Sequence, residues 1–163
     1  MARTELDRAV LGSVLDRLTD DAPREPSDPH LSREESARRF RQSVLRDLDW
    51  LLNTRRTAVV ADREGEVHES VYEFGLRDFS GLSTSTADWR QRLLDDVQDA
   101  IRRFEPRLAN VNVELSDASA NPATHQVRFV ISATLLMDPS PEQVVFDTLL
   151  EVASGTYQVE SQD

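Results

Sequence analysis

The segment FEPRLANVNVEL, residues 104–115, is where the apolar residues change from a helical period to a period of two. Pro106 ends the helix that comes before it, because the residue preceding a proline is pushed out of helical geometry. Beyond the proline, Val111, Val113 and Leu115 alternate with polar residues, which is typical of a strand with one buried face. The segment therefore predicts a helix followed by a strand, and with it a mixed α and β fold.

Three more strands are expected after this junction. Residues 127–137 alternate in the same way, and Val130 and Leu136 add apolar side chains on the second face, so this strand is expected to lie inside the sheet. Residues 143–152 have a similar pattern, and Gly155 permits a turn into one more short strand. Because the connections are short and polar, we expect an antiparallel meander.

Two long amphipathic helices are expected before the junction. Ser32 and Glu35 have the spacing of a capping box, and an apolar stripe runs from there to about Asn53. A second stripe predicts a helix over residues 87–104, and a short strand is expected between the helices at 58–61. The predicted fold class is therefore α+β, with two main helices packed on a small, mainly antiparallel sheet.

The N-terminal region reads as a separate helix tethered to this body. Apolar residues recur at helical spacing up to Leu18, and Thr4 can cap the start of the helix. Residues 19–31 then carry three prolines among acidic residues, which excludes a helix and favours an extended tether. We therefore divide the chain into an N-terminal partner-binding helix at 1–18, a linker at 19–31 and an α+β domain at 32–163.

Composition argues against several classes of function. With 30 acidic and 19 basic residues the net charge is −11, so the surface repels nucleic acid and anionic membranes. The chain has no cysteine, which excludes disulfides, thiol nucleophiles and thiolate metal sites. The first residues include acidic ones and lead into no long apolar stretch, so we expect no signal peptide, no direct membrane insertion and a cytoplasmic location.

The sequence contains no constellation typical of a catalytic or cofactor site. His30, His68 and His125 lie far apart, and none stands at the spacing of a metal-ligand pair. No phosphate-binding glycine loop and no nucleophile elbow is present. Glu105 could be proposed as an acid, but three neighbouring arginines favour its ionised form and lower its pKa. We therefore expect no enzyme activity, no cofactor and no metal.

Glu105, Pro106 and Arg107 form the most unusual local feature. The proline fixes the direction in which the chain leaves the helix, so the two charged residues flank a rigid corner. Such a corner suits recognition of a partner by charge-assisted hydrogen bonds. An internal ion pair that locks the helix–strand junction fits the same residues, and the local sequence leaves both interpretations open.

Several stretches of the chain resemble the TssE family of type VI secretion baseplate proteins, which is related to the wedge protein of contractile phage tails. They follow one another in order along nearly the whole chain, which makes the resemblance more specific than any one motif. They are SVLDRL (13–18), SVLRDLDWLLNTRR (43–56), SVYEFGLRDFSG (70–81), FEPRL with VNV (104–108 and 111–113) and VFDTL (145–149).

The resemblance implies a structural role in a baseplate wedge, on a fold that resembles the domain by which sheath subunits interlock. Such a protein links the baseplate to the contractile sheath and initiates sheath polymerisation by pairing at a strand edge. The implied partners are the wedge proteins TssF, TssG and TssK and the sheath subunits TssB and TssC, in an assembly docked at the inner membrane. Two alternatives stay open: a regulatory protein-binding module on the same fold, and a peptidoglycan hydrolase, since relatives have carried a lysozyme name.

Two groups of residues are expected to bind partners. The resemblance assigns baseplate contact to the triplet Glu105, Pro106 and Arg107. The second group is on the N-terminal helix, because small exposed apolar helices commonly dock in a partner's groove. It consists of Leu11, Leu15, Arg17 and Leu18.

Overall fold

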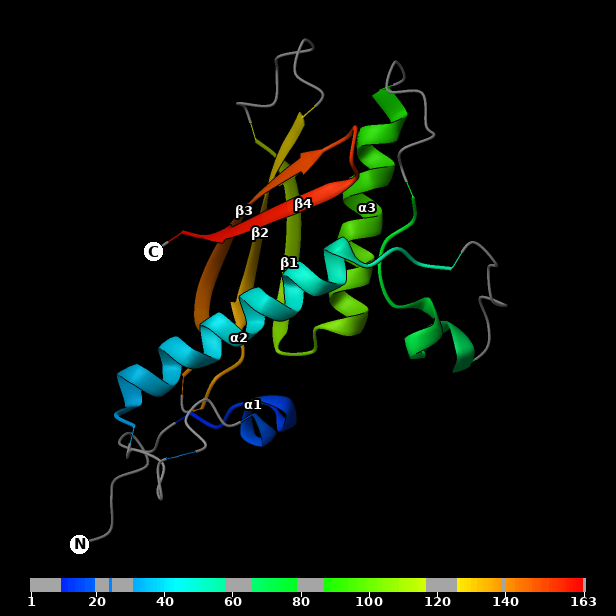
Figure 1. The fold of residues 1–163 in the computed structure, drawn as a ribbon. Coiled ribbons are helices and arrows are strands. Elements are labelled where there is room, and N and C mark those ends of the chain that lie inside the picture. The colour runs from blue at the N-terminus through cyan, green and yellow to red at the C-terminus, as the bar shows by residue number, and fades with distance from the viewer. Residues whose placement is uncertain are drawn as a thin grey trace, which may run out of the picture.

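The computed structural model describes residues 10–19, 24, 31–57, 66–78, 87–116, 126–138 and 140–162. The helices come first along the chain and the strands last (Figure 1). The helical elements are α1 (Val14–Leu18), α2 (Arg33–Asn53), two short 3-10 helices η2 (Glu66–Glu69) and η3 (Val71–Glu73), and α3 (Ala87–Phe104). The strands are β1 (Leu108–Leu115), β2 (Gln126–Leu135), β3 (Glu142–Glu151) and β4 (Thr156–Ser161). This arrangement confirms the α+β class.

The sheet is an antiparallel meander in the order β1-β2-β3-β4, as the short polar connections predict. β2 and β3 pair without interruption over ten residues, with Ile131 opposite Phe146. β1 has an irregularity between Ala109 and Asn112, where Asn110 takes a positive φ of 53°. Asparagine tolerates this left-handed geometry better than most residues, so the bulge has a local cause.

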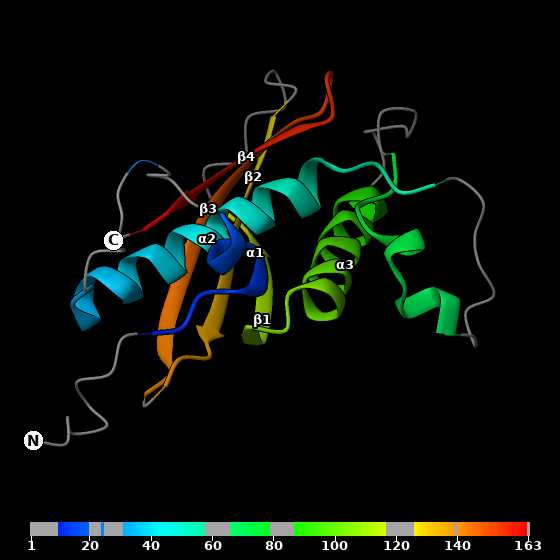
Figure 2. The same cartoon turned by 60° about the horizontal axis from the view of Figure 1, so that its bottom comes forward.

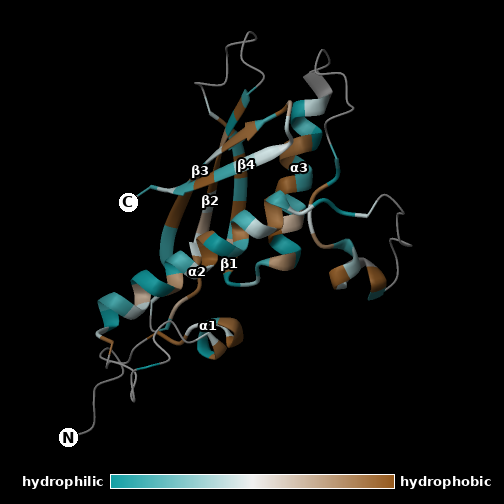
Figure 3. Ribbon diagram, viewed as in Figure 1, coloured by the Kyte–Doolittle hydropathy of each residue, from teal (hydrophilic) through white to brown (hydrophobic). Residues whose placement is uncertain are grey.

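One face of the sheet forms the core together with α2 and α3. Buried residues alternate along β2 and β3, and the positions between them are half-buried or exposed. The same separation of apolar and polar residues recurs along the helices in Figure 3. Val44, Leu48, Val97 and Ile101 are fully buried at the helical side of the core. Each large apolar side chain buried in this way contributes about 1.5–3 kcal/mol, so the core holds α2 and α3 against the sheet.

The ends of the long helices match their sequence signals. Ser32 accepts from the backbone N–H of Glu35, and the Glu35 carboxylate accepts from the N–H of Ser32, which completes the expected capping box. α3 ends at Phe104, directly before the residue that precedes Pro106. The predicted bounds of both helices are therefore confirmed.

The first helix is shorter than predicted. α1 begins at Val14, and residues 10–13 are not helical; Thr4 lies outside the described residues. The physical reason is a second capping box, in which Ser13 and Asp16 satisfy each other's backbone N–H groups. The strand expected at 58–61 and the three linker prolines also lie outside the described residues.

Residues 54–56 and 73–76 pair beside the core, which the sequence did not predict. Arg55 and Leu76 form a parallel bridge, in which the N–H of Leu76 donates to the carbonyl of Thr54 at 2.9 Å. Gly75 has a φ of +101°, and a Cβ atom there would collide with the same Thr54 carbonyl. Buried Glu73 lies 3.2 Å from Arg56, so an ion pair closes this contact. Figure 2 shows the η2–η3 segment beside the end of α3, held to the body through this pairing.

Candidate functional site

In the Glu105-Pro106-Arg107 corner, the two charged side chains form an ion pair with each other. Glu105 is only 4% exposed, and both of its oxygens accept from Arg107, at 2.6 Å from Nε and 2.5 Å from Nη2. The turn at Pro106 brings residues 105 and 107 together, and the backbone N–H of Arg107 also donates to Oε1 of Glu105 at 3.3 Å. The internal ion pair that the sequence left open is therefore formed, while a contact with a partner stays a prediction.

Arg107 also ties the corner to α2. Its Nη2 lies 2.6 Å from Oδ2 of Asp47, and its Nη1 donates to the hydroxyl of Ser43 at 3.2 Å. The guanidinium carbon lies 5.7 Å from the centre of the Phe40 ring. Burial disfavours the cation, but the hydrogen bonds and charges of Glu105 and Asp47 outweigh it and raise the pKa of Arg107. The arginine is thus a permanently charged clamp between α2 and the start of β1.

A chain of charges continues from this clamp to α1. Asp47 accepts from Arg46 on its second oxygen at 2.8 Å, and the same Arg46 nitrogen lies 2.9 Å from Asp16 of α1. The guanidinium of Arg46 also lies 5.1 Å from the ring centre of Trp50. The structure therefore joins the two groups of residues predicted separately, because α1 and the corner meet through neighbouring residues of α2.

α1 rests on α2 through polar contacts and presents apolar side chains outward. Besides the Asp16 ion pair, the N–H of Val10 donates to the Ser36 hydroxyl at 2.9 Å. Leu11 is 78% and Leu18 79% exposed. Val14, Leu15 and Arg17 are also exposed. A helix normally buries its apolar side, so this orientation leaves an apolar surface without a covering element among the described residues.

The two edges of the sheet differ in how their outward-facing backbone groups are bonded. In an antiparallel ladder every second residue points its N–H and C=O away from the neighbouring strand. On β1, the outward carbonyl of Val111 accepts from Arg102 of α3 at 3.1 Å. On β4, both outward groups of Tyr157 are bonded by Asn53 of α2, and the next outward residues are Val159 and Ser161. The end of β4 is therefore the more open stretch of edge.

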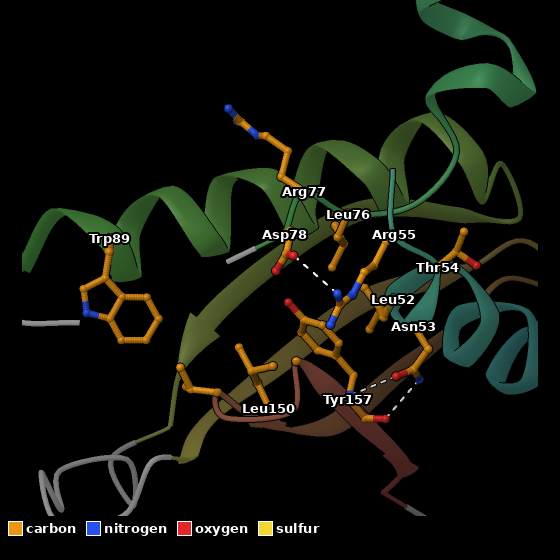
Figure 4. Close-up of a pocket in the computed structure, with 12 residues that line it drawn as sticks. Leu52, Asn53, Thr54, Arg55, Leu76, Arg77, Asp78, Trp89, Leu150 and Tyr157 are labelled. Atoms are coloured by element: carbon orange, nitrogen blue, oxygen red, sulfur yellow. Dashed lines mark hydrogen bonds and ion pairs between the residues drawn. The ribbon is translucent and has the colours of Figure 1, made fainter. Parts of the chain in front are cut away.

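A pocket opens between the end of α2, residues 76–78, α3 and the turn from β3 to β4 (Figure 4). Its two arginines are paired with carboxylates: Arg55 lies 3.3 Å from Asp78, and Arg77 donates to Asp96 at 2.8 Å. Burial and the charge of Asp96 raise the pKa of Tyr157, so its hydroxyl remains protonated at neutral pH. The pocket thus offers a neutral phenol and paired charges, which is not the pattern of a nucleophile or an anion site.

The described part of the chain was not found to offer a metal site. It holds no group of three or more His, Cys, Asp or Glu side chains placed to share an ion. His30 and His125 lie outside that part. Glu105 and Asp47, the two carboxylates at the corner, both form ion pairs with Arg107.

A family described as "Baseplate wedge protein gp25" matches residues 38–140, which is more than half of the chain. The chain belongs to this gp25 family. TssE is the type VI secretion homologue of gp25, so the family resemblance inferred from sequence is confirmed. A search of curated proteins finds no significant match.

The gp25 match extends from the second turn of α2 to the turn after β2. It includes the corner and its α2 contacts, while α1, β3 and β4 fall outside the matched residues. A baseplate structural role follows from the family. Within the described residues of this gp25-family chain, no helix is both long and apolar enough to cross a membrane.

Sequence reasoning missed the α2 residues that complete the site, namely Ser43, Arg46, Asp47 and Asn53. A signal was present for two of them. Ser43 and Asp47 lie one turn apart and follow Phe40 along the buried side of α2, so they are polar positions beside a buried stripe. Nothing local distinguishes Asn53, because its partner is 104 residues away.

Proposed function

We propose that this chain is a structural wedge component of a type VI secretion baseplate. It links the baseplate, through TssF, TssG and TssK, to the sheath subunits TssB and TssC, and it initiates sheath polymerisation by pairing at a strand edge. It acts without catalysis, in the cytoplasm, within an assembly docked at the inner membrane. Membership of the gp25 family supports the baseplate role.

The observation that carries the strand-pairing step is the open end of β4. The ladder to β3 leaves the N–H and C=O groups of Val159 and Ser161 directed outward. Such unpaired groups are a template for an added strand, with main-chain hydrogen bonds giving affinity. The β1 edge is a poorer template, since Arg102 of α3 already occupies its outward Val111 carbonyl.

Val159→Pro tests this step. A proline at 159 removes an outward N–H and leaves the bonds between β3 and β4 intact, because those belong to the flanking residues. We expect it to block co-purification with TssB and TssC and to leave the melting temperature nearly unchanged. The matched control is Leu115→Pro, which makes the same change at an outward position of β1. Equal loss of binding in both variants would remove β4 as the site.

The exposed side of α1 and the corner are the proposed contacts to the wedge proteins. Replacing Leu11, Leu15 and Leu18 by serine should weaken co-purification with TssF and TssG, because each side chain would otherwise be buried in the partner. Stability of the free protein should be nearly unchanged, since all three are exposed. Arg17→Ala adds a test of the charged residue on the same helix. If serine variants unfold the protein and bind normally, α1 belongs to the body instead.

A further inference from the structure

Asn53 bonds to the backbone of β4 as a neighbouring strand would. Its Nδ2 donates to the carbonyl of Tyr157 at 3.0 Å, and its Oδ1 accepts from the N–H of Tyr157 at 2.9 Å. Figure 4 shows the two bonds side by side at the end of α2. The amide is held in place from its own helix, because Nδ2 also lies 3.0 Å from the carbonyl and from Oδ1 of Asp49.

The geometry matches the needs of a strand edge. Tyr157 stands opposite Leu150 in the ladder, at a position where neither residue bonds the other, so its N–H and C=O both point outward. A side-chain amide offers one donor group and one acceptor, which is what a paired strand would supply at that residue. Asn53 therefore ends the open edge, and the free stretch begins at Val159.

The side chains beside this free stretch indicate which strand fits it. Asp147 and Glu160 stand directly opposite each other on the outer face of β3 and β4, and both are exposed. Like charges in such a pair are destabilising. A basic side chain on an added strand, next to Glu160 on the same face, would offset this repulsion.

We propose that Asn53 is the register stop for strand addition at β4, and that the added strand is an extended segment with a basic residue facing Glu160. This rests on the proposed strand pairing with the sheath subunits. Without the stop, the edge would extend by one outward residue, Tyr157. The added strand could then slip by two residues and keep the same face toward the core.

Hydrogen exchange in the free protein tests whether Asn53 covers the edge at Tyr157, independently of any added strand. Asn53→Ala should make the Tyr157 amide exchange at least about tenfold faster, corresponding to a lost bond worth about 1.4 kcal/mol. Core amides such as that of Ile131 should not change. Asn112→Ala is the matched control, because Asn112 lies on the opposite edge strand and its side chain donates to the Glu114 carboxylate. An unchanged Tyr157 amide in Asn53→Ala would overturn the proposal.

Disulfide trapping tests the register in the complex. The chain has no cysteine, so Gln158→Cys on the outer face of β4 gives a single reporter. Single cysteines are then placed along the segment of TssB or TssC that pairs with it. We expect one cross-linked position with Asn53 present and two positions, two residues apart, with Asn53→Ala. One unchanged position would overturn the register stop, whereas no cross-link at all would overturn the strand pairing itself.

Charge reversal tests the chemistry of the added strand. Glu160→Lys relieves the repulsion from Asp147, so it should not destabilise the fold. We expect it to weaken sheath-subunit binding about tenfold. Glu151→Lys, at the other end of β3, is the matched control and should bind normally. Binding that is unchanged or stronger in Glu160→Lys would overturn the basic partner strand.

Discussion

Arg107 donates to Asp47 across 2.6 Å, and this one contact joins the turn before β1 to the middle of α2. Asp47 is shared, because its other oxygen accepts from Arg46, which in turn binds Asp16. The corner, α2 and α1 thus belong to one continuous set of ion pairs. A partner that binds any residue of this set therefore binds a side chain that is already paired with its neighbours in the set.

Arg107→Ala should destabilise the protein by roughly 3–5 kcal/mol, because it leaves Glu105 as a buried, unpaired carboxylate. An arginine with no such partners would change stability by less than about 0.5 kcal/mol. Urea unfolding measures the difference. Arg92→Ala, at an exposed position on α3, is the control and should be neutral. A stable Arg107→Ala protein that fails to bind its partners would instead make the residue an interface contact alone.

The contact between α1 and α2 should weaken at acid pH, when Asp16 becomes protonated. Burial raises the pKa of Asp16, but hydrogen bonds from Ser13 and the Arg46 ion pair outweigh it and hold the pKa below its ordinary value of 3.8. A carboxyl with a depressed folded pKa stabilises fully above its unfolded pKa and loses that contribution as the pH falls through the folded pKa. The Val10 amide resonance, which reports the contact with Ser36, should therefore shift only below about pH 4.

Asp16→Asn provides the comparison for that titration. At neutral pH the variant should already show the Val10 amide resonance at the position that the unmodified protein reaches in acid. Its Val10 resonance should not shift further when the pH is lowered. Asp95→Asn on α3 should titrate like the unmodified protein. A Val10 transition that persists in Asp16→Asn would assign the effect to another carboxylate.

Thr148→Val should stabilise the fold by about 1 kcal/mol, because the buried Thr148 hydroxyl has no hydrogen-bond partner among the residues that the structure describes and valine has nearly the same shape. For a chain of this length that is a rise in melting temperature of roughly 2–4 °C. Thr134→Val on the other face of the sheet is the control, and it should not stabilise, since its hydroxyl accepts from Gln143. A lower melting temperature for Thr148→Val would show that the hydroxyl has a partner in solution.

Gly75→Ala should cost about 3 kcal/mol, since it combines a positive φ with a collision against the Thr54 carbonyl. Gly155→Ala is a graded control: it also has a positive φ, but its Cβ would meet only the flexible end of Arg55 at 3.4 Å. We expect about 1 kcal/mol there. Calorimetry that ranks the two variants equally would argue that strain, and not the collision, decides the cost.

The elements with strong local signals were predictable. Ser32 with Glu35, and Pro106 after α3, mark their helix ends through hydrogen bonds and sterics that involve only neighbouring residues. The strands followed from alternation, because one face of the sheet is buried. The start of α1 was misplaced because the apolar spacing extends to residues before it, whereas the Ser13–Asp16 capping box begins the helix only at Val14.

The site was only partly predictable, since its decisive contacts are long-range. The sequence singled out Glu105 and Arg107 but could not choose between an internal pair and a partner contact. That choice depends on Asp47 and Ser43, which lie 60 and 64 residues away from Arg107. The bridge between Arg55 and Leu76 is an isolated pair, so no periodic pattern in the sequence predicts it. Gly75, which has a positive φ, is the local sequence feature that accompanies it.

The bond between Asn53 and Tyr157 also has a consequence for synthesis on the ribosome. The two residues are 104 positions apart, so α2 is complete well before β4 is translated. The contact can close only after the last strand has left the exit tunnel, which places it late in folding, as expected for a pairing of such sequence separation. Exposed strand edges make nascent chains prone to aggregate. Asn53 is synthesised before β4, so it can bond the outward N–H and C=O of Tyr157 as soon as that strand emerges.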